Sequence, residues 1–271
     1  MIPRADYHVH TNFCDGAADP ETMVRAALAQ GMEAIGFSGH SHTAFDESWC
    51  MSREGTLAYR AEIARLKETY GDRIRILCGV EQDMFSDADT AGYDYVIGSV
   101  HYLCCGGEYV PVDESPEHLR AAAKAHFGGD LCALAAAYYE TVSRVWDVTH
   151  CDVIGHFDLI EKFNEGGALF DSGDARIAKA RSAAADQLAA CGVPFEINTG
   201  AIARGYRTEP YPGAELRTYL AARGVRFLLS GDAHRPEGLC FQFDAWDELP
   251  GLCYVDAPRG GHSILCPHAK A

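Results

Sequence analysis

The chain of 271 residues has no apolar run of the roughly 18 residues that a membrane span needs. Residues 1–6 show no apolar signal segment. The 11 cysteines are odd in number and scattered, no Cys-X-X-Cys pair occurs, and Cys104 and Cys105 are adjacent, which is an unusual spacing for zinc ligands. These absences predict reduced thiols, no disulfide framework, no zinc ribbon, no membrane partner and a cytoplasmic location.

Positive charge is also scarce. The chain contains 23 Lys and Arg against 39 Asp and Glu, which gives a formal net charge of -16. This charge argues against nucleic acid or an anionic membrane as a partner. A phosphorylated small molecule remains compatible with it, provided that bound cations reverse the local field. Because no repeat, low-complexity tract or linker divides the sequence, we expect one domain over residues 1–271.

Seven apolar stretches alternate with helical ones. Helical patterns with Asp, Pro or Gly at their ends cover residues 19–30, 54–70, 117–127, 130–149, 174–190 and 213–223. Strands are expected in residues 6–16 together with a turn, and in 34–37, 74–80, 93–100, 152–155, 193–197 and 225–229. This alternation predicts an α/β fold with a parallel sheet and helices outside it.

The first strand carries a candidate metal motif. His8 and His10 lie two residues apart, so a strand would direct both imidazoles to the same side. Asp15 follows at a turn that ends at Gly16 and adds a carboxylate within reach. Two imidazoles and a carboxylate suit zinc, iron or manganese.

Residues of the same chemistry recur where other strands end. A single histidine in such a place is more often a packed or solvated side chain, but the repetition favours a shared site. In a closed α/β barrel, the carboxyl ends of the strands form the active-site face. The recurring candidates are His40, Glu81, His101, His156, Asp232 and His234.

The order of these motifs resembles the PHP family, named for its polymerase and histidinol-phosphatase members, over nearly the whole chain. Within the family, residues 195–200 with Arg204 and Arg207 are more similar to the histidinol-phosphate phosphatases than to the polymerase-associated domains. The motifs that carry the resemblance are Asp-Tyr-His-Val-His-Thr at 6–11 with Asp15-Gly16, Gly-Phe-Ser-Gly-His at 36–40, Gly-Val-Glu at 79–81, Gly-Ser-Val-His at 98–101, Gly155-His156, and Ser-Gly-Asp-Ala-His at 230–234.

The resemblance implies a distorted (β/α)7 barrel with three divalent transition-metal ions, zinc, iron or manganese. It assigns the ligands residue by residue: His8, His10, Glu81 and Asp232 for the first ion, Glu81 as a bridge with His101 and His156 for the second, and Asp15, His40 and His234 for the third. Glu81, Asp232 and His234 are accordingly the expected catalytic residues.

Such a centre has a definite chemistry. Two metal ions about 3.5–4 Å apart can activate a bridging water at neutral pH, and three cations can neutralise the oxygens of a phosphate monoester. Arg204 and Arg207 could bind the non-bridging oxygens. Asp232 or a metal-bound water could protonate the leaving oxygen.

The resemblance therefore implies a phosphoric monoester hydrolase for L-histidinol phosphate in histidine biosynthesis. Asp46 or Glu47, after His40, could hold the cationic end of this substrate. One alternative is a PHP phosphoesterase for another small phosphate ester or a nucleotide. Another is a non-catalytic metal-binding module, against which the complete ligand set argues.

Overall fold

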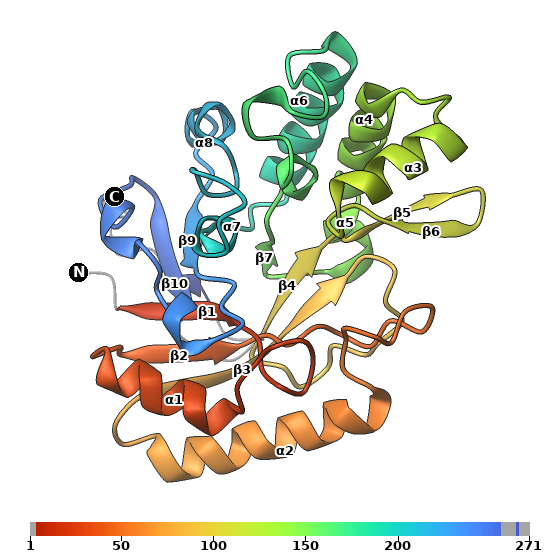
Figure 1. The fold of residues 1–271 in the computed structure, drawn as a ribbon. Helices are drawn as coiled ribbons and strands as arrows, with labels where there is room; N and C mark the ends of the chain where they lie inside the picture. The colour runs from red at the N-terminus through yellow and green to blue at the C-terminus, as the bar shows by residue number, and fades with distance from the viewer. Residues whose placement is uncertain (1–3, 256–263, 266–271) are drawn as a thin grey trace.

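The computed structural model describes residues 4–255 and 264–265; residues 1–3, part of the start that predicts no signal segment, lie outside the described residues. One large sheet organises the chain, in the order β1-β2-β3-β4-β7-β8-β9-β10-β11 (Figure 1). Neighbours from β1 to β10 are parallel, and β11 is antiparallel to β10. The strands are β1 (Ala5–Val9), β2 (Ala34–Phe37), β3 (Arg75–Asp83), β4 (Tyr95–Ser99), β7 (Val153–Ile154), β8 (Phe195–Asn198), β9 (Phe227–Ser230), β10 (Leu252–Val255) and β11 (Ile264–Leu265).

The sheet nearly closes on itself between β1 and β9. Val9 and Ala233 form an isolated parallel bridge. The backbone N–H of His10 donates to the Ala233 carbonyl at 2.9 Å, and that of Ala233 donates to the His8 carbonyl at 2.9 Å. The seven expected strands thus form a nearly closed barrel, and the distorted (β/α)7 prediction is confirmed.

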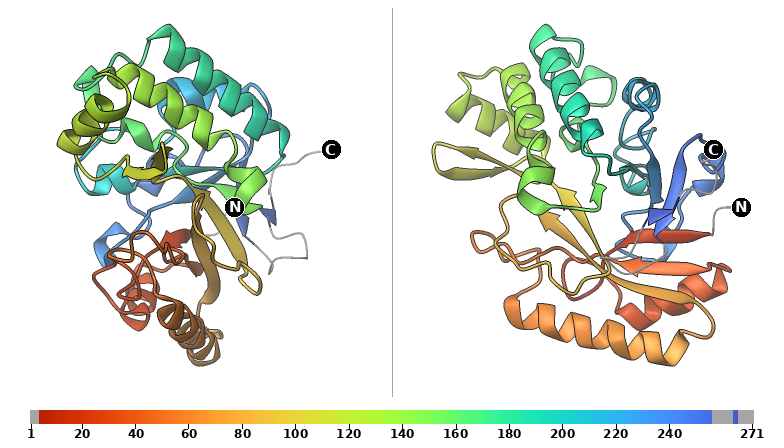
Figure 2. Two further views of the ribbon diagram at one scale, coloured as in Figure 1. Left: turned by 90° about the vertical axis from the view of Figure 1, so that its right-hand side faces the viewer. Right: turned by 180° about the vertical axis from the view of Figure 1, so that it is seen from behind.

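Helices cover the outside of the sheet. Figure 2 shows α1 and α2 on one side of the molecule and α3, α4 and α6 grouped on another. No helix in the described part of the chain is long and apolar enough to cross a membrane. The helices are α1 (Pro20–Ala29), α2 (Arg53–Tyr70), α3 (Pro116–His126), α4 (Leu131–Val142), α5 (Val145–Thr149), α6 (Ala175–Ala190), α7 (Gly200–Ala203) and α8 (Ala214–Ala221), with short 3-10 turns η1 (Leu159–Glu161), η2 (Glu165–Gly167), η3 (Pro236–Gly238) and η4 (Phe243–Ala245).

Several elements differ from the expectation. The helix expected over 130–149 is divided into α4 and α5, and β10 and β11 were not predicted. The segment after His101, expected as a loop, is an antiparallel hairpin of β5 (Tyr102–Cys105) and β6 (Glu108–Pro111). Gly106 and Gly107 connect the two strands with φ of 62° and 93°, a conformation that glycine adopts without steric cost.

Tyr95 packs inside the barrel and needs glycine neighbours. Its hydroxyl donates to the Tyr7 carbonyl at 2.6 Å. A Cβ atom at Gly79 would lie 2.3 Å from the Tyr95 ring, and one at Gly36 would lie 2.5 Å from its hydroxyl. The register between β1 and β2 also shifts between Asp6 and Val9. A shift of this kind re-aims side chains, and here the shifted stretch contains His8 and ends directly before His10.

Candidate metal centre

All nine predicted ligands converge at the carboxyl end of the barrel. Each stands at the end of a strand or in the loop that directly follows one, so the parallel sheet brings together residues up to 226 positions apart, from His8 to His234. Three sets of their ligand atoms lie within 4.8 Å of one another: His10, Asp15, His40 and His234; His8, His10 and Asp232; and His40, Glu81 and His101.

Glu81 lies at the middle of the cluster. Its Oε1 is 2.8 Å from His156 Nε2 and 3.3 Å from His101 Nε2. Its Oε2 is 2.8 Å from His40 Nδ1 and 3.1 Å from His8 Nε2. The two oxygens of this buried carboxylate therefore face different histidines, as a carboxylate that bridges two ions must.

His10 and Asp232 complete the set around His8. His10 Nε2 lies 3.3 Å from Asp232 Oδ1 and 3.5 Å from Glu81 Oε2. His8 Nε2 lies 3.8 Å from the same Asp232 oxygen. The two imidazoles and two carboxylates that were expected to hold the first ion thus point at one volume.

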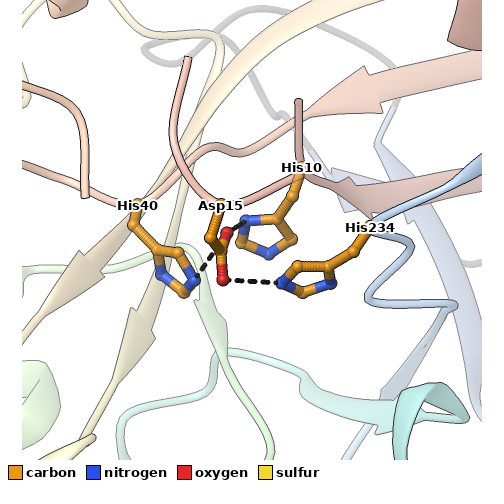
Figure 3. A group of neighbouring side chains, drawn as sticks. All are labelled: His10, Asp15, His40 and His234. Atoms are coloured by element: carbon orange, nitrogen blue, oxygen red, sulfur yellow. Dashed lines mark hydrogen bonds and ion pairs between the residues drawn. The ribbon is translucent and has the colours of Figure 1, made fainter. Parts of the chain in front are cut away.

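Asp15 is the centre of the third set. Figure 3 shows the imidazoles of His10, His40 and His234 around its carboxylate. Asp15 Oδ2 is 3.2 Å from His234 Nε2, and Oδ1 is 3.6 Å from His40 Nε2. His10 Nδ1 lies 3.7 Å from Oδ1, so His10 faces this set as well as the first.

The donor atoms fit metal ions. Buried polar atoms are normally hydrogen-bonded. Among the described residues, five buried atoms of this cluster have no hydrogen-bond partner: His8 Nε2, His10 Nε2, His40 Nδ1, His156 Nδ1 and Glu81 Oε2. Nitrogen and oxygen donors directed at a common volume suit zinc or a related divalent ion.

The charges of the cluster are strongly coupled. Burial would raise the pKa of Glu81, but His8, His40 and His101 hold it well below its usual range. Burial would lower the pKa of His40, but Glu81 and Asp15 raise it to about 9. Burial, reinforced by His234 and His40, lowers the pKa of His10 to about 3. In the absence of ions the carboxylates are thus ionised and some of the imidazoles hold protons in place of metal.

A cavity of about 530 Å³ opens beside the cluster. Arg204 lines it, and its Nη2 donates to Asp232 Oδ2 at 2.8 Å. Asp46 also lines it. Glu47 instead pairs with His42 at 2.8 Å and is not part of the lining.

Arg207, the other arginine expected at the phosphate, does not line this cavity. Its Nη1 donates to the Glu161 carbonyl and its Nη2 to Glu209, both at 3.2 Å. Its guanidinium lies 5.1 Å from the centre of the Tyr211 ring, and its side chain is only 7% exposed. The guanidinium of Arg207 thus connects the segment that contains Glu161 to the segment that contains Glu209.

Other cavity residues were missed by the sequence analysis. Lys162 follows η1 and donates from Nζ to the Asp113 carbonyl at 2.7 Å. Trp49 and Tyr102 form an aromatic wall, in which Trp49 Nε1 donates to the Tyr102 hydroxyl at 2.6 Å. The hydroxyl of Tyr102 in turn donates to Asp46 at 2.7 Å. Only the hairpin and loop geometry brings these residues together, so no local pattern marked them.

Comparisons with known proteins agree with this architecture. A protein of Deinococcus radiodurans named as a probable histidinol-phosphatase is 30% identical over 100% of this chain and 99% of its own length. One of Schizosaccharomyces pombe with the same name is 30% identical over 95% of this chain and 92% of its own.

Two solved structures share the fold. A Listeria monocytogenes protein assigned as a histidinol phosphatase has a TM-score of 0.75 at 18% identity, covering 89% of this chain and 99% of the other. A Lactococcus lactis histidinol phosphate phosphatase, solved with zinc, L-histidinol and phosphate, has a TM-score of 0.62 at 21% identity, covering 87% and 88%. The family model for the PHP domain matches residues 6–200. The chain belongs to the PHP family.

Proposed function

We propose that this protein is a metal-dependent phosphatase that hydrolyses L-histidinol phosphate to L-histidinol and phosphate. The observation that carries the proposal is the convergence of nine ligand side chains, with six histidines around the carboxylates of Glu81 and Asp15, beside a cavity lined by Arg204. The substrate is supported by the two relatives named as histidinol-phosphatases, which align over nearly their full lengths.

The centre is proposed to hold three divalent ions, with zinc as the first candidate because a structural neighbour contains it. His8, His10, Glu81 and Asp232 would hold one ion, Glu81, His101 and His156 a second, and Asp15, His40 and His234 a third. Bound ions would supply Lewis-acid activation of water and neutralise phosphate charge.

Arg204 is the proposed phosphate-binding residue. It is the arginine that lines the cavity, and its guanidinium is anchored at the metal-ligand carboxylate of Asp232. Lys162 forms an ion pair with Asp113 and adds a second cation to the cavity wall. These two side chains would offset the negative charge of a phosphate dianion in an otherwise acidic protein.

Asp232 is more consistent with a ligand than with a proton donor. Burial would raise its pKa, but Arg204 and His8 hold it well below the usual range, so the carboxylate is ionised. An ionised carboxylate accepts hydrogen bonds and binds cations but has no proton to give. We therefore propose that Asp232, Glu81 and His234 act in catalysis by holding the centre.

The cavity also suits the end of histidinol phosphate that carries the ammonium and imidazole groups. Asp46, Asp113 and Glu114 line it in addition to the metal-ligand residues, and the aromatic side chains of Trp49 and Tyr102 form part of the wall. An ammonium group would pair with a carboxylate, and a flat imidazole would pack against the aromatic wall. Of the two acids expected for this role, Asp46 is retained.

The domain extent, cellular location and partners of the protein are also part of the proposal. We propose one phosphoesterase domain over residues 1–271 that acts in the cytoplasm on a small phosphorylated substrate, without nucleic acid as a partner. One sheet containing strands from both ends of the described chain, β1 and β11, supports the single domain.

The test is phosphate release by purified protein from histidinol phosphate, nucleoside monophosphates, sugar phosphates and an aryl phosphate. Histidinol phosphate should be the substrate with the highest kcat/KM. A nucleotide or sugar phosphate that is preferred would contradict the substrate assignment but retain the phosphoesterase. No release from any of them by zinc-loaded protein would contradict the enzyme class.

A further inference from the structure

Glu196, in β8, is a buried carboxylate directly behind the candidate metal centre. Glu196 is 1% exposed and does not line the cavity. Its Oε1 lies 2.5 Å from His8 Nδ1 and also accepts from the hydroxyl of Ser230. Its Oε2 accepts from the backbone N–H of His156 at 2.7 Å and from Asn198 Nδ2 at 3.1 Å. One carboxylate therefore joins the ends of four strands.

We infer that Glu196 is a positioning residue that fixes His8 with its proton on Nδ1 and its Nε2 lone pair directed at the first ion site. The inference rests on the metal centre of the proposed function and adds to it a residue that contacts neither ions nor substrate. A carboxylate accepts hydrogen bonds, so His8 Nδ1 must donate to it. His8 Nε2, the other ring nitrogen, lies 3.1 Å from Glu81 Oε2 and has no hydrogen-bond partner among the described residues.

The same carboxylate also reaches the second ion site. The backbone N–H of His156 donates to Glu196, and the imidazole Nε2 of His156 lies 2.8 Å from Glu81 Oε1. Carboxylates that accept from the distal nitrogen of a ligand histidine orient the ring, and removing such a partner typically weakens metal binding by about 10–100-fold. Glu196 can orient the ring of His8 in this way, and it also accepts a hydrogen bond from the backbone N–H of His156.

The surrounding donors make Glu196→Gln an informative variant. The backbone N–H of His156 cannot reverse, and Asn198 Oδ1 is already occupied by the Gly200 N–H at 2.8 Å, so Asn198 presents its Nδ2. These two fixed donors require the glutamine oxygen at the Oε2 position. The glutamine NH2 group would then donate to His8 Nδ1 and force the proton onto Nε2, where the metal should bind.

The experiment loads unmodified protein, Glu196→Gln and the control Ser230→Ala with zinc and measures the zinc retained against increasing chelator. Ser230→Ala removes a donor to Glu196 but leaves the carboxylate on His8. We expect Glu196→Gln to release zinc from the affected site at about 10–100-fold lower chelator strength, and Ser230→Ala to remain close to the unmodified protein. The unfolding temperature of metal-free Glu196→Gln should stay close to that of the metal-free unmodified protein.

Equal zinc retention by Glu196→Gln and the unmodified protein would overturn this inference and leave the proposed function standing. A lower unfolding temperature without a loss of zinc would also overturn it, because that is what a purely structural role predicts. An unmodified protein that retains no zinc would overturn the metal centre and this inference together.

A second measurement does not depend on the variant folding. In zinc-loaded unmodified protein with 15N-labelled histidine, the His8 signal should show a protonated Nδ1 and a zinc-bound Nε2. Zinc on Nδ1 of His8 would contradict the inference.

Discussion

Arg204 donates a hydrogen bond of 2.8 Å from Nη2 to Oδ2 of Asp232, and a second, of 2.9 Å, from Nη1 to the Asp232 carbonyl. The cation that faces the cavity is thus tied to a carboxylate of the candidate metal centre. Asp232 itself has a φ of 48°, a left-handed conformation that is uncommon outside glycine. A phosphate bound at the ions would therefore meet a guanidinium that is already oriented.

Replacing Arg204 should weaken catalysis for every phosphate monoester. A hydrogen bond to a charged group contributes about 1.5–3 kcal/mol, so Arg204→Ala should lower kcat/KM roughly ten- to a hundredfold. Steady-state kinetics with histidinol phosphate and an aryl phosphate would check this. An effect on only one of the two substrates would contradict a role at the phosphate.

Arg207 provides the matched control. Because its side chain is 7% exposed and donates to Glu209 and to the Glu161 carbonyl, Arg207→Met should lower the free energy of unfolding by about 1.5–3 kcal/mol. Denaturant titration measures this change. The kcat/KM of the folded fraction should fall less than it does in Arg204→Ala.

Glu81→Ala should remove both turnover and bound metal. The two carboxylate oxygens face different histidines, at 2.8 Å from His156 and 2.8 Å from His40, so one substitution disturbs two ion sites. Elemental analysis should show fewer ions per chain than in the unmodified protein, while circular dichroism stays near normal. Near-normal activity would show that Glu81 does not bridge.

Asp46→Asn should reduce selectivity and leave the chemistry intact. The carboxylate lines the cavity beside Tyr102, so we expect roughly a tenfold loss of kcat/KM for histidinol phosphate. An aryl phosphate without a cationic group should be nearly unaffected. Glu47→Gln is the control, because Glu47 pairs with His42 outside the cavity and should change neither substrate. Equal losses for both substrates in Asp46→Asn would exclude recognition of the cationic end.

Zinc binding should release protons at pH 7. Neighbouring carboxylates raise the pKa of His8 and His101 well above the ordinary value, and that of His40 to about 9, in each case against the effect of burial. These groups hold protons at pH 7 without ions and must lose one to bind. Zinc affinity should therefore fall as the pH falls. Calorimetry in two buffers of different ionisation enthalpy should show a net release of protons on zinc binding. No release would contradict the ligand assignment.

The strand ends could be predicted from the sequence because two local signals coincide there. Apolar runs define the strands, and parallel strands place their carboxyl ends on one face, so His101 and His156 could be assigned to one site without any long-range information. The pair Gly106-Gly107 is a local signal for the β5–β6 hairpin, which we predicted as a loop.

The loops around the cavity could not be predicted in this way. Arg204 and Arg207 are three residues apart with the same chemistry, yet one faces the cavity and the other packs on Tyr211. Their directions are set by contacts with Asp232 and Glu161, which are distant in the sequence. The same holds for Lys162, whose partner Asp113 lies 49 residues away.

The most direct test of zinc-dependent histidinol phosphate hydrolysis is the kcat/KM of one preparation for this substrate, measured zinc-loaded, after chelation and after zinc is restored. We expect rapid phosphate release by the loaded protein, loss of activity on chelation and its recovery with zinc. We also expect a kcat/KM well above that for an aryl phosphate. Activity that survives complete removal of metal, or zinc-loaded protein that does not turn over histidinol phosphate, would contradict the proposed function.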